Sequence, residues 1–183
     1  MCSSDLSQTP RWKAMSLATR TLASSRNSSP GINITDVASV KEFFNQAGSF
    51  DAIIATLGSA PLVHLEDADT DDFQAELNNK LQGQINLVLH GLDHLVDGGS
   101  FTLITGILAQ HPVEKSVVAS TVNGGLEAFS YTASTDLPRG IRINTVSPNV
   151  VEESLDTSCA FLPGFEPVRA QSVANSLSAP PMA

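Results

Sequence analysis

The stretch Arg139-Gly-Ile-Arg-Ile-Asn-Thr-Val-Ser-Pro-Asn-Val-Val151 decides the fold. Gly140 is expected to end a preceding helix, and the β-branched residues after it predict a short buried strand that Pro148 ends. The same order of helix, glycine and buried strand recurs upstream. The sequence therefore predicts an α/β fold, a doubly wound and mostly parallel sheet with helices on both faces.

Composition bounds the class of protein. The 183 residues are 42% hydrophobic and 16% charged, which suffices for one core and one domain. A net charge of −9 argues against nucleic-acid and anionic-membrane partners. The two cysteines, Cys2 and Cys159, have no metal-ligand spacing, and no apolar run is long enough to span a bilayer. We therefore expect a protein of the cytoplasm.

The chain divides into a polar segment over 1–20, expected to be poorly ordered or a short helix, one domain over 21–168 and a loop-like tail over 169–183. Apolar periodicity and turn residues define the elements expected within the domain. Strands are expected at 21–25, 32–36, 51–58, 100–105 and 141–146, and helices at 37–47, 70–96 and 114–135.

Two features of the region 66–96 could suggest a metal. The acidic cluster over 66–72 lacks the glycine and closing glutamate of a calcium loop, and a helix N-terminus attracts such residues. His90 and His94 lie four residues apart, but no third ligand is apparent. We expect solvated or interface histidines and no metal site.

Three further motifs accompany the stretch over 139–151. They are Asn-Lys-Leu-Gln-Gly-Gln at 79–84, Thr-Gly-Ile-Leu-Ala at 105–109 and Val-Asn-Gly-Gly-Leu-Glu-Ala-Phe at 122–129. Together they resemble a small, divergent subgroup of the short-chain dehydrogenases/reductases, over residues 21–168. The resemblance implies a Rossmann-like fold and an NAD(P)-dependent oxidoreductase of small carbonyl or alcohol substrates. The chain looks truncated at both ends, because the first strand with its Gly-rich turn and the last strand are missing.

The resemblance also places the family's active site on this chain. The family uses Tyr-x-x-x-Lys with a Ser and an Asn. Here the matching positions hold Ala119, Asn123, Gly106 and Lys80, with Thr105 just before the glycine. Two alternatives follow. Lys80, Thr105 and Asn123 form a rewired site with Lys80 as acid/base, or Lys80 only binds backbone carbonyls in a pseudoenzyme with an interaction or scaffold role.

By the same resemblance, the cofactor is NADP or NAD. Arg26 matches a residue that meets the 2′-phosphate, although a solvated loop arginine explains it equally well. Asp36 and Val37 match a pair at the adenine ring, and capping alone would also explain the aspartate. Gly58 matches a close backbone approach to a bound ring or to a neighbouring helix. The turn Pro148, Asn149 and Val150 matches the segment beside the nicotinamide.

The resemblance implies an oligomer as well. Family members pair through helices that match 70–96 and 114–135, so we expect a homodimer or homotetramer.

Overall fold

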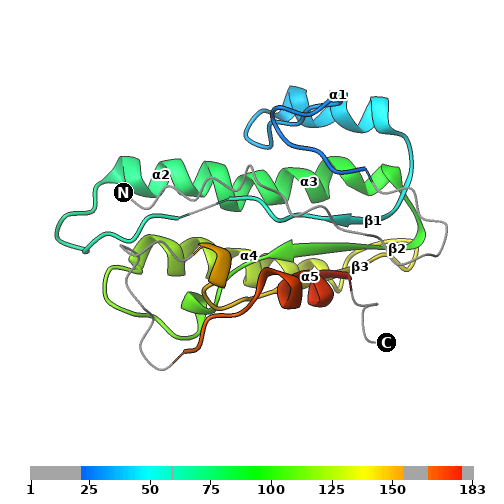
Figure 1. Cartoon of the computed structure of the whole chain (residues 1–183). Coiled ribbons are helices and arrows are strands. Elements are labelled where there is room, and N and C mark those ends of the chain that lie inside the picture. The colour runs from blue at the N-terminus through cyan, green and yellow to red at the C-terminus, as the bar shows by residue number, and fades with distance from the viewer. Residues whose placement is uncertain (1–21, 59, 155–164, 179–183) are drawn as a thin grey trace.

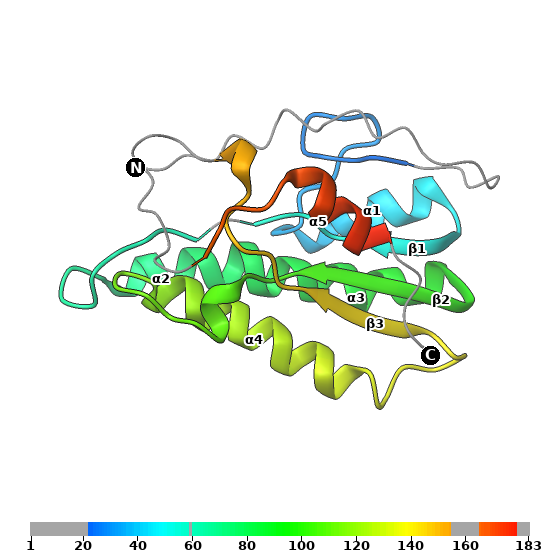
Figure 2. The ribbon, with the colours of Figure 1, turned by 60° about the horizontal axis from the view of Figure 1, so that its bottom comes forward.

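The computed structural model describes residues 22–58, 60–154 and 165–178, so the expected segment over 1–20 lies outside the described residues. Within the described residues, three parallel strands form the sheet: β1 (Phe50–Ile54), β2 (Leu95–Ile104) and β3 (Arg142–Val146). Their order is β1-β2-β3. Figure 2 shows the three arrows pointing the same way, with β2 in the middle. The parallel sheet predicted from the sequence is confirmed.

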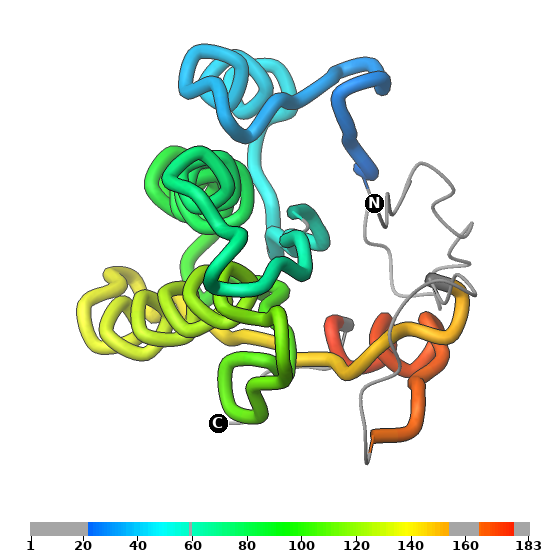
Figure 3. The backbone as a smooth tube through the Cα atoms, turned by 90° about the vertical axis from the view of Figure 1, so that its left-hand side faces the viewer, coloured from blue at the N-terminus to red at the C-terminus, as the bar shows by residue number. Residues whose placement is uncertain are grey.

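Helices cover both faces of this sheet. Figure 3 shows α1, α3 and α4 on one side and α5 on the other. The fold is therefore a Rossmann-like, doubly wound α/β fold, of whose sheet the described residues supply three strands. The helices are α1 (Val37–Ala47), α2 (Thr70–Glu76), α3 (Gly83–Gly91), α4 (Val117–Ala133) and α5 (Ala170–Ser178), with the short segments η1 (Leu77–Gln82), η2 (Leu92–His94), η3 (Ile107–Ala109) and η4 (Glu152–Ser154) (Figure 1).

The middle strand explains why both faces must be covered. Phe101 and Leu103 of β2 are completely buried. Ser100 and Thr102, whose side chains alternate with theirs, are also buried. A strand with two buried faces is typical of parallel sheets packed between helices. The core therefore lies around β2. The carboxyl ends of the three strands lie together at one edge of the sheet.

Local chemistry sets the ends of α1. Asp36 is the N-cap, since its Oδ1 accepts the backbone N–H of Ala38 at 2.9 Å. Gly48, at φ 85°, ends the helix and donates its N–H to Phe44. This confirms the bounds predicted for the helix over 37–47.

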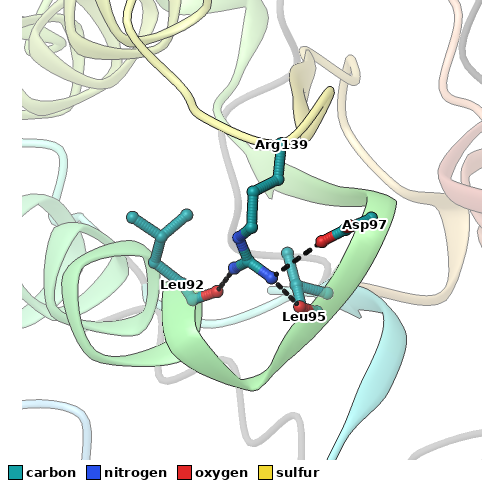
Figure 4. A network of polar contacts seen from close by, with 4 residues as sticks. All are labelled: Leu92, Leu95, Asp97 and Arg139. Carbon is teal, nitrogen blue, oxygen red and sulfur yellow. Dashed lines mark hydrogen bonds and ion pairs between the residues drawn. The ribbon is translucent and has the colours of Figure 1, made fainter.

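Arg139 joins the turn before β3 to the start of β2 (Figure 4). Its guanidinium donates to the carbonyl oxygen of Leu92 at 2.6 Å and to that of Leu95 at 2.8 Å. It also pairs with the carboxylate of Asp97 at 3.3 Å. Gly140 follows at φ 68° and turns the chain into β3. This contact fixes the amino-terminal edge of the sheet.

Two strand predictions are wrong. Residues 22–25 and 31–33 have no regular secondary structure, 26–30 form a turn and a bend, and 34–35 form a turn. The carbonyl of Ser25 accepts the N–H groups of Ser28 and Ile32, which closes a loop instead. Ile32 and Ile34 are nevertheless buried. Their apolar pattern therefore predicted burial correctly, but it did not predict whether these residues pair with a strand.

The long helices also differ from their predicted bounds. The helix over 70–96 contains the π-helical segment η1 and gives way at Leu95 to β2, where the same apolar residues serve the strand. The helix over 114–135 starts later, at Val117, because Lys115 has a left-handed φ of 71°. Residues 170–178 of the expected loop-like tail form α5. None of the described helices is long and apolar enough to cross a membrane.

Candidate functional site

The carboxyl ends of the three strands gather the candidate residues at one edge of the sheet. β1 leads to Gly58, β2 to Thr105 and β3 to Pro148. The N–H of Thr105 binds the carbonyl of Val146 at 2.9 Å, and that of Ile107 binds Pro148 at 3.1 Å. In open α/β sheets, ligands bind at this edge.

Lys80 is buried at this edge. It lies in the π-helical segment η1, is 7% exposed, and donates from Nζ to the backbone carbonyl of Thr105 at 3.2 Å. Burial lowers the pKa of the Lys80 amine to about 8, and the charge of Glu76 opposes this shift. π-Helical segments are rare, occur mostly as single turns inside α-helices, and are frequent at functional sites.

Glu76 lies one turn before Lys80. Burial raises the pKa of its carboxyl, while hydrogen bonding to Asn79 and the charge of Lys80 act in the opposite direction. Its Oε2 is buried and has no hydrogen-bond partner among the described residues. The two groups therefore form a partly desolvated pair of acid and base.

Gly58 makes room for the lysine. It has φ 97°, and a Cβ at this position would lie 2.7 Å from Cγ of Lys80. Only glycine combines this backbone conformation with so close an approach. Gly58 was expected to lie close to a bound ring or a neighbouring helix, and the structure places the Lys80 side chain of the helical segment η1 against it.

Asn123 comes from α4 to the same edge. It is 3% exposed, and a Cβ on Gly106 would lie 2.9 Å from its Nδ2. Its Oδ1 has no hydrogen-bond partner in the described part of the chain. A serine at 106, the residue that the resemblance places there, would collide with the Asn123 amide. The two positions are therefore adapted to each other.

Glu127 completes the cluster and was missed by the sequence analysis. Its Oε1 accepts the hydroxyl of Thr105 at 3.2 Å, and its other oxygen accepts the amide of Gln110. Its spacing in the sequence could have identified it, because Glu127 lies four residues after Asn123 and therefore on the same face of the helix.

Gln84 was missed as well. It is completely buried, and its amide donates to the carbonyls of Leu57 and Ile104 at 3.1 and 2.9 Å. Its Oε1 accepts the N–H of Ile104 at 3.1 Å. Gln84 therefore clamps the ends of β1 and β2. Glu76, Lys80 and Gln84 follow at intervals of four, a polar stripe that could have marked the face toward the strands.

The remaining candidate cofactor residues serve local structure. Arg26 is exposed in the loop over 25–30, and Val37 is 40% exposed. Asp36 uses its carboxylate to cap α1. Asn149 accepts the N–H of Val150 and donates to the carbonyl of Glu166 at 2.7 Å.

A nicotinamide nucleotide fits this edge in part. Gly58 and Pro148 lie at strand ends, where the nicotinamide of such a fold binds. A pyrophosphate needs free N–H groups at a helix N-terminus. Here the N-terminus of α1 is capped by an acidic side chain, and a Cβ on Gly31 would face the carbonyl of Ser28 at 3.0 Å. Neither feature of the described residues offers a pyrophosphate cradle.

The two histidines lie away from this edge. His94 stacks on Phe44 with ring centroids 5.3 Å apart, and its Nδ1 lies 3.3 Å from the carbonyl oxygen of Gly48. Among the described residues, no group of three or more His, Cys, Asp or Glu could hold a metal ion.

Comparisons with known proteins identify the family. A family model described as enoyl-(acyl carrier protein) reductase matches residues 12–179. The protein lin1944 from Listeria innocua is 44% identical, with a TM-score of 0.79 over 84% of this chain and 77% of that chain. The chain therefore belongs to the short-chain dehydrogenase/reductase family.

Two further relatives bear on function. A small-chain dehydrogenase solved in complex with NADPH is 29% identical, with a TM-score of 0.66 over 70% of this chain and 61% of that chain. An uncharacterized oxidoreductase of Methylorubrum extorquens is 27% identical over 121 residues, which are 65% of this chain and 49% of the relative. The chain thus spans about half the length of that curated relative.

Proposed function

We propose that the chain is a short-chain dehydrogenase/reductase-like protein for NADP or NAD, with weak or no oxidoreductase activity on carbonyl or alcohol substrates. One observation carries the proposal: the buried amine of Lys80 is bound to a backbone carbonyl of Thr105. The single tyrosine, Tyr131, is 80% exposed on α4, so no phenol accompanies this amine. Hydride transfer to a carbonyl needs a positioned proton donor, and this edge provides a poor one.

Any remaining activity is expected to depend on Lys80. A pKa of about 8 leaves roughly a tenth of the amine neutral at pH 7, so Lys80 can both release and accept a proton. The Thr105 carbonyl holds the amine, Glu127 orients the threonine hydroxyl, and Asn123 lies beside the adjoining Gly106. A bound nucleotide would supply the hydride, and these residues would supply only proton transfer and orientation.

Nucleotide binding is expected to be weak. The NADPH complex of the 29% identical dehydrogenase and the strand-end edge support binding of NADP or NAD. Two observations oppose tight nucleotide binding. Asp36 and Asn149 are used in local hydrogen bonds, and the N-terminus of α1 is already capped. Arg26 is the one candidate whose exposed guanidinium is available to a 2′-phosphate.

A second candidate function is a non-catalytic interaction or scaffold role. Leu89 on α3 is 59% exposed and Tyr131 on α4 is 80% exposed, so both helices present apolar surface to a partner. We propose a cytoplasmic homodimer or homotetramer through the helices within 70–96 and 114–135. Light scattering should give a dimer or tetramer that the pair Leu89→Glu and Tyr131→Glu converts to monomer. A monomeric wild-type protein would overturn this arrangement.

The nucleotide proposal is tested by titrating the protein with NADPH and NADH and following nucleotide fluorescence. We expect saturation at roughly 0.1–1 mM, and about tenfold weaker NADPH binding by Arg26→Ala, since a charge-assisted hydrogen bond contributes about 1.5–3 kcal/mol. Arg142→Ala, at the other end of the sheet, is the matched control. If folded protein shows no saturation at millimolar nucleotide, the proposed oxidoreductase function is wrong and the interaction role remains.

A further inference from the structure

The strand β2 bulges out of the sheet just after it begins. Phe50 of β1 pairs with Leu95, whereas Ala52, only two residues further along β1, pairs with Ser100. Residues 96–99 therefore form a bulge in β2, and the first three residues of this bulge are exposed. The bulge lies at the amino-terminal edge of the sheet, opposite the edge that holds the candidate site.

The tip of this bulge is the dipeptide Asp97-Gly98. The Asp97 side chain is 81% exposed, and Gly98 adopts a left-handed φ of 74° with open space where a Cβ would lie. An aspartate followed by glycine can form a succinimide, because glycine has no Cβ that would keep its backbone nitrogen away from the preceding side chain. The dipeptide therefore has the chemistry of a modification site that needs no reagent other than water.

The modification has two steps. First, the backbone nitrogen of Gly98 bonds to Cγ of Asp97, the C–O bond to the carboxyl hydroxyl breaks, and the N–H proton leaves with that hydroxyl as water. Water then opens the resulting cyclic imide at one of its two carbonyl carbons. One product is the original aspartate. The other product is isoaspartate, in which the backbone runs through the side chain and carries one additional carbon atom.

Arg139 holds both of the reacting groups. Its guanidinium pairs with the Asp97 carboxylate at 3.3 Å (Figure 4), and its backbone carbonyl accepts the N–H of Gly98 at 2.9 Å. Arg142 adds a hydrogen bond to the carbonyl oxygen of Gly98 at 3.2 Å. For the ring to close, the carboxyl group must leave the guanidinium and the nitrogen must turn away from the Arg139 carbonyl. The folded structure therefore opposes the reaction at both atoms.

The chain holds one competing dipeptide, Asn123-Gly124. By sequence alone this dipeptide should react first, because an amide side chain closes the same ring more readily than a carboxylate does. The structure reverses that order. Asn123 is 3% exposed in the middle of α4, where the Gly124 N–H takes part in the helical hydrogen bonds. The exposed bulge can open locally, whereas Asn123 reacts only if α4 unfolds.

We propose that Asp97-Gly98 is a site of isoaspartate formation in this protein, and that Arg139 keeps it closed in the folded state. The reaction proceeds when the bulge opens locally and releases both groups from Arg139. The additional backbone carbon of isoaspartate then displaces the Gly98 N–H from the Arg139 carbonyl, so the modified bulge does not return to its original geometry. Modification therefore loosens the contact that joins β2 to the turn before β3.

The test is prolonged incubation of the full chain at neutral pH, with isoaspartate measured by mass spectrometry of proteolytic peptides. Isoaspartate and its succinimide precursor, which is lighter by one water, should appear at Asp97 before any change at Asn123. Arg139→Met should raise the rate at Asp97 at least about tenfold, since losing a hydrogen bond to a charged group changes an opening equilibrium by about that factor. Asp97→Glu should abolish the signal, because glutamate would have to close a larger ring.

Val122→Ala is the matched control, because Val122 is completely buried in α4 and its truncation lowers global stability without touching the bulge. Circular dichroism verifies that each variant is folded. If Arg139→Met does not fold, Arg139→Lys takes its place, since lysine keeps the charge but lacks the planar fork and should still raise the rate.

Three results overturn the proposal. They are conversion of Asn123 before Asp97, a rate at Asp97 that the Arg139 variant does not raise, and an equal rise in Val122→Ala. Absence of isoaspartate at Asp97 from both the wild type and the Arg139 variant overturns it as well. No nucleotide is present, so the result is independent of the proposed function.

Discussion

Replacing Lys80 by methionine should stabilise the protein at neutral pH. The Lys80 amine is 7% exposed, and its pKa falls from 10.5 to about 8 on folding. At 1.36 kcal/mol for each pH unit, this difference corresponds to about 3 kcal/mol for keeping the amine charged in the fold. Methionine has a similar shape and no charge, so it avoids that cost.

The pH dependence follows from the sign of the shift. Between pH 8 and pH 10.5 the unfolded chain holds the Lys80 proton more tightly than the folded protein, so wild-type stability rises with pH in this window. Below pH 8 both states are protonated and the full cost is present. The advantage of Lys80→Met should thus be about 1–3 kcal/mol at pH 7, because Glu76 also loses a favourable charge, and should vanish toward pH 10.5.

Urea unfolding at several pH values between 7 and 10 measures this difference. Lys41→Met is the matched control, because Lys41 is exposed on α1 and its replacement should give a curve parallel to wild type. Equal stability of Lys80→Met and wild type at pH 7, with no change as the pH rises, would refute the desolvation of Lys80.

Three further predictions test the packing of the site and the sheet. Gly58→Ala should lower the free energy of unfolding by about 2–4 kcal/mol, because φ is 97° and a Cβ would lie 2.7 Å from a neighbouring side chain. Gly124→Ala, with open space around it, should raise it by up to about 1 kcal/mol. Thermal melting distinguishes the two variants. Gly106→Ser should cost about 1–3 kcal/mol, and Asn123→Ala in the same chain should recover part of it in a double-mutant cycle. Arg139→Met should cost about 2 kcal/mol in urea unfolding, because it leaves two backbone carbonyls without their donor; a loss below 0.5 kcal/mol would contradict that role.

The fold could be predicted because its signals are local. Asp36 and Gly48 set the two ends of α1, and Gly140 with the β-branched residues after it sets β3. Strand pairing is not local, so residues 22–25 and 32–36 looked like strands although no strand within the described residues pairs with them. The apolar side chain of Leu95 fits the core-facing pattern of a helix and of a strand equally well. The helix ends at the turn η2, so Leu95 begins the strand β2.

The candidate site was predicted in part. Lys80 and Thr105 meet as the motifs suggested, since both belong to quoted segments that end at the same edge. For Gly58 the sequence left a bound ring and a neighbouring helix open, because it does not show which group lies against a glycine. Glu127 and Gln84 act through contacts between residues more than 15 positions apart, and such contacts leave only the spacing of four as a trace.

The most direct test of the central claim is the rate of NADPH oxidation with a panel of aldehydes and ketones, measured for wild-type protein and Lys80→Met. The account predicts rates near the uncatalysed background for the panel, with any small excess removed by Lys80→Met. Turnover of about 1 per second or more, in the range of ordinary enzymes, would contradict a degenerate site. Turnover that survives Lys80→Met would contradict the role given to the lysine.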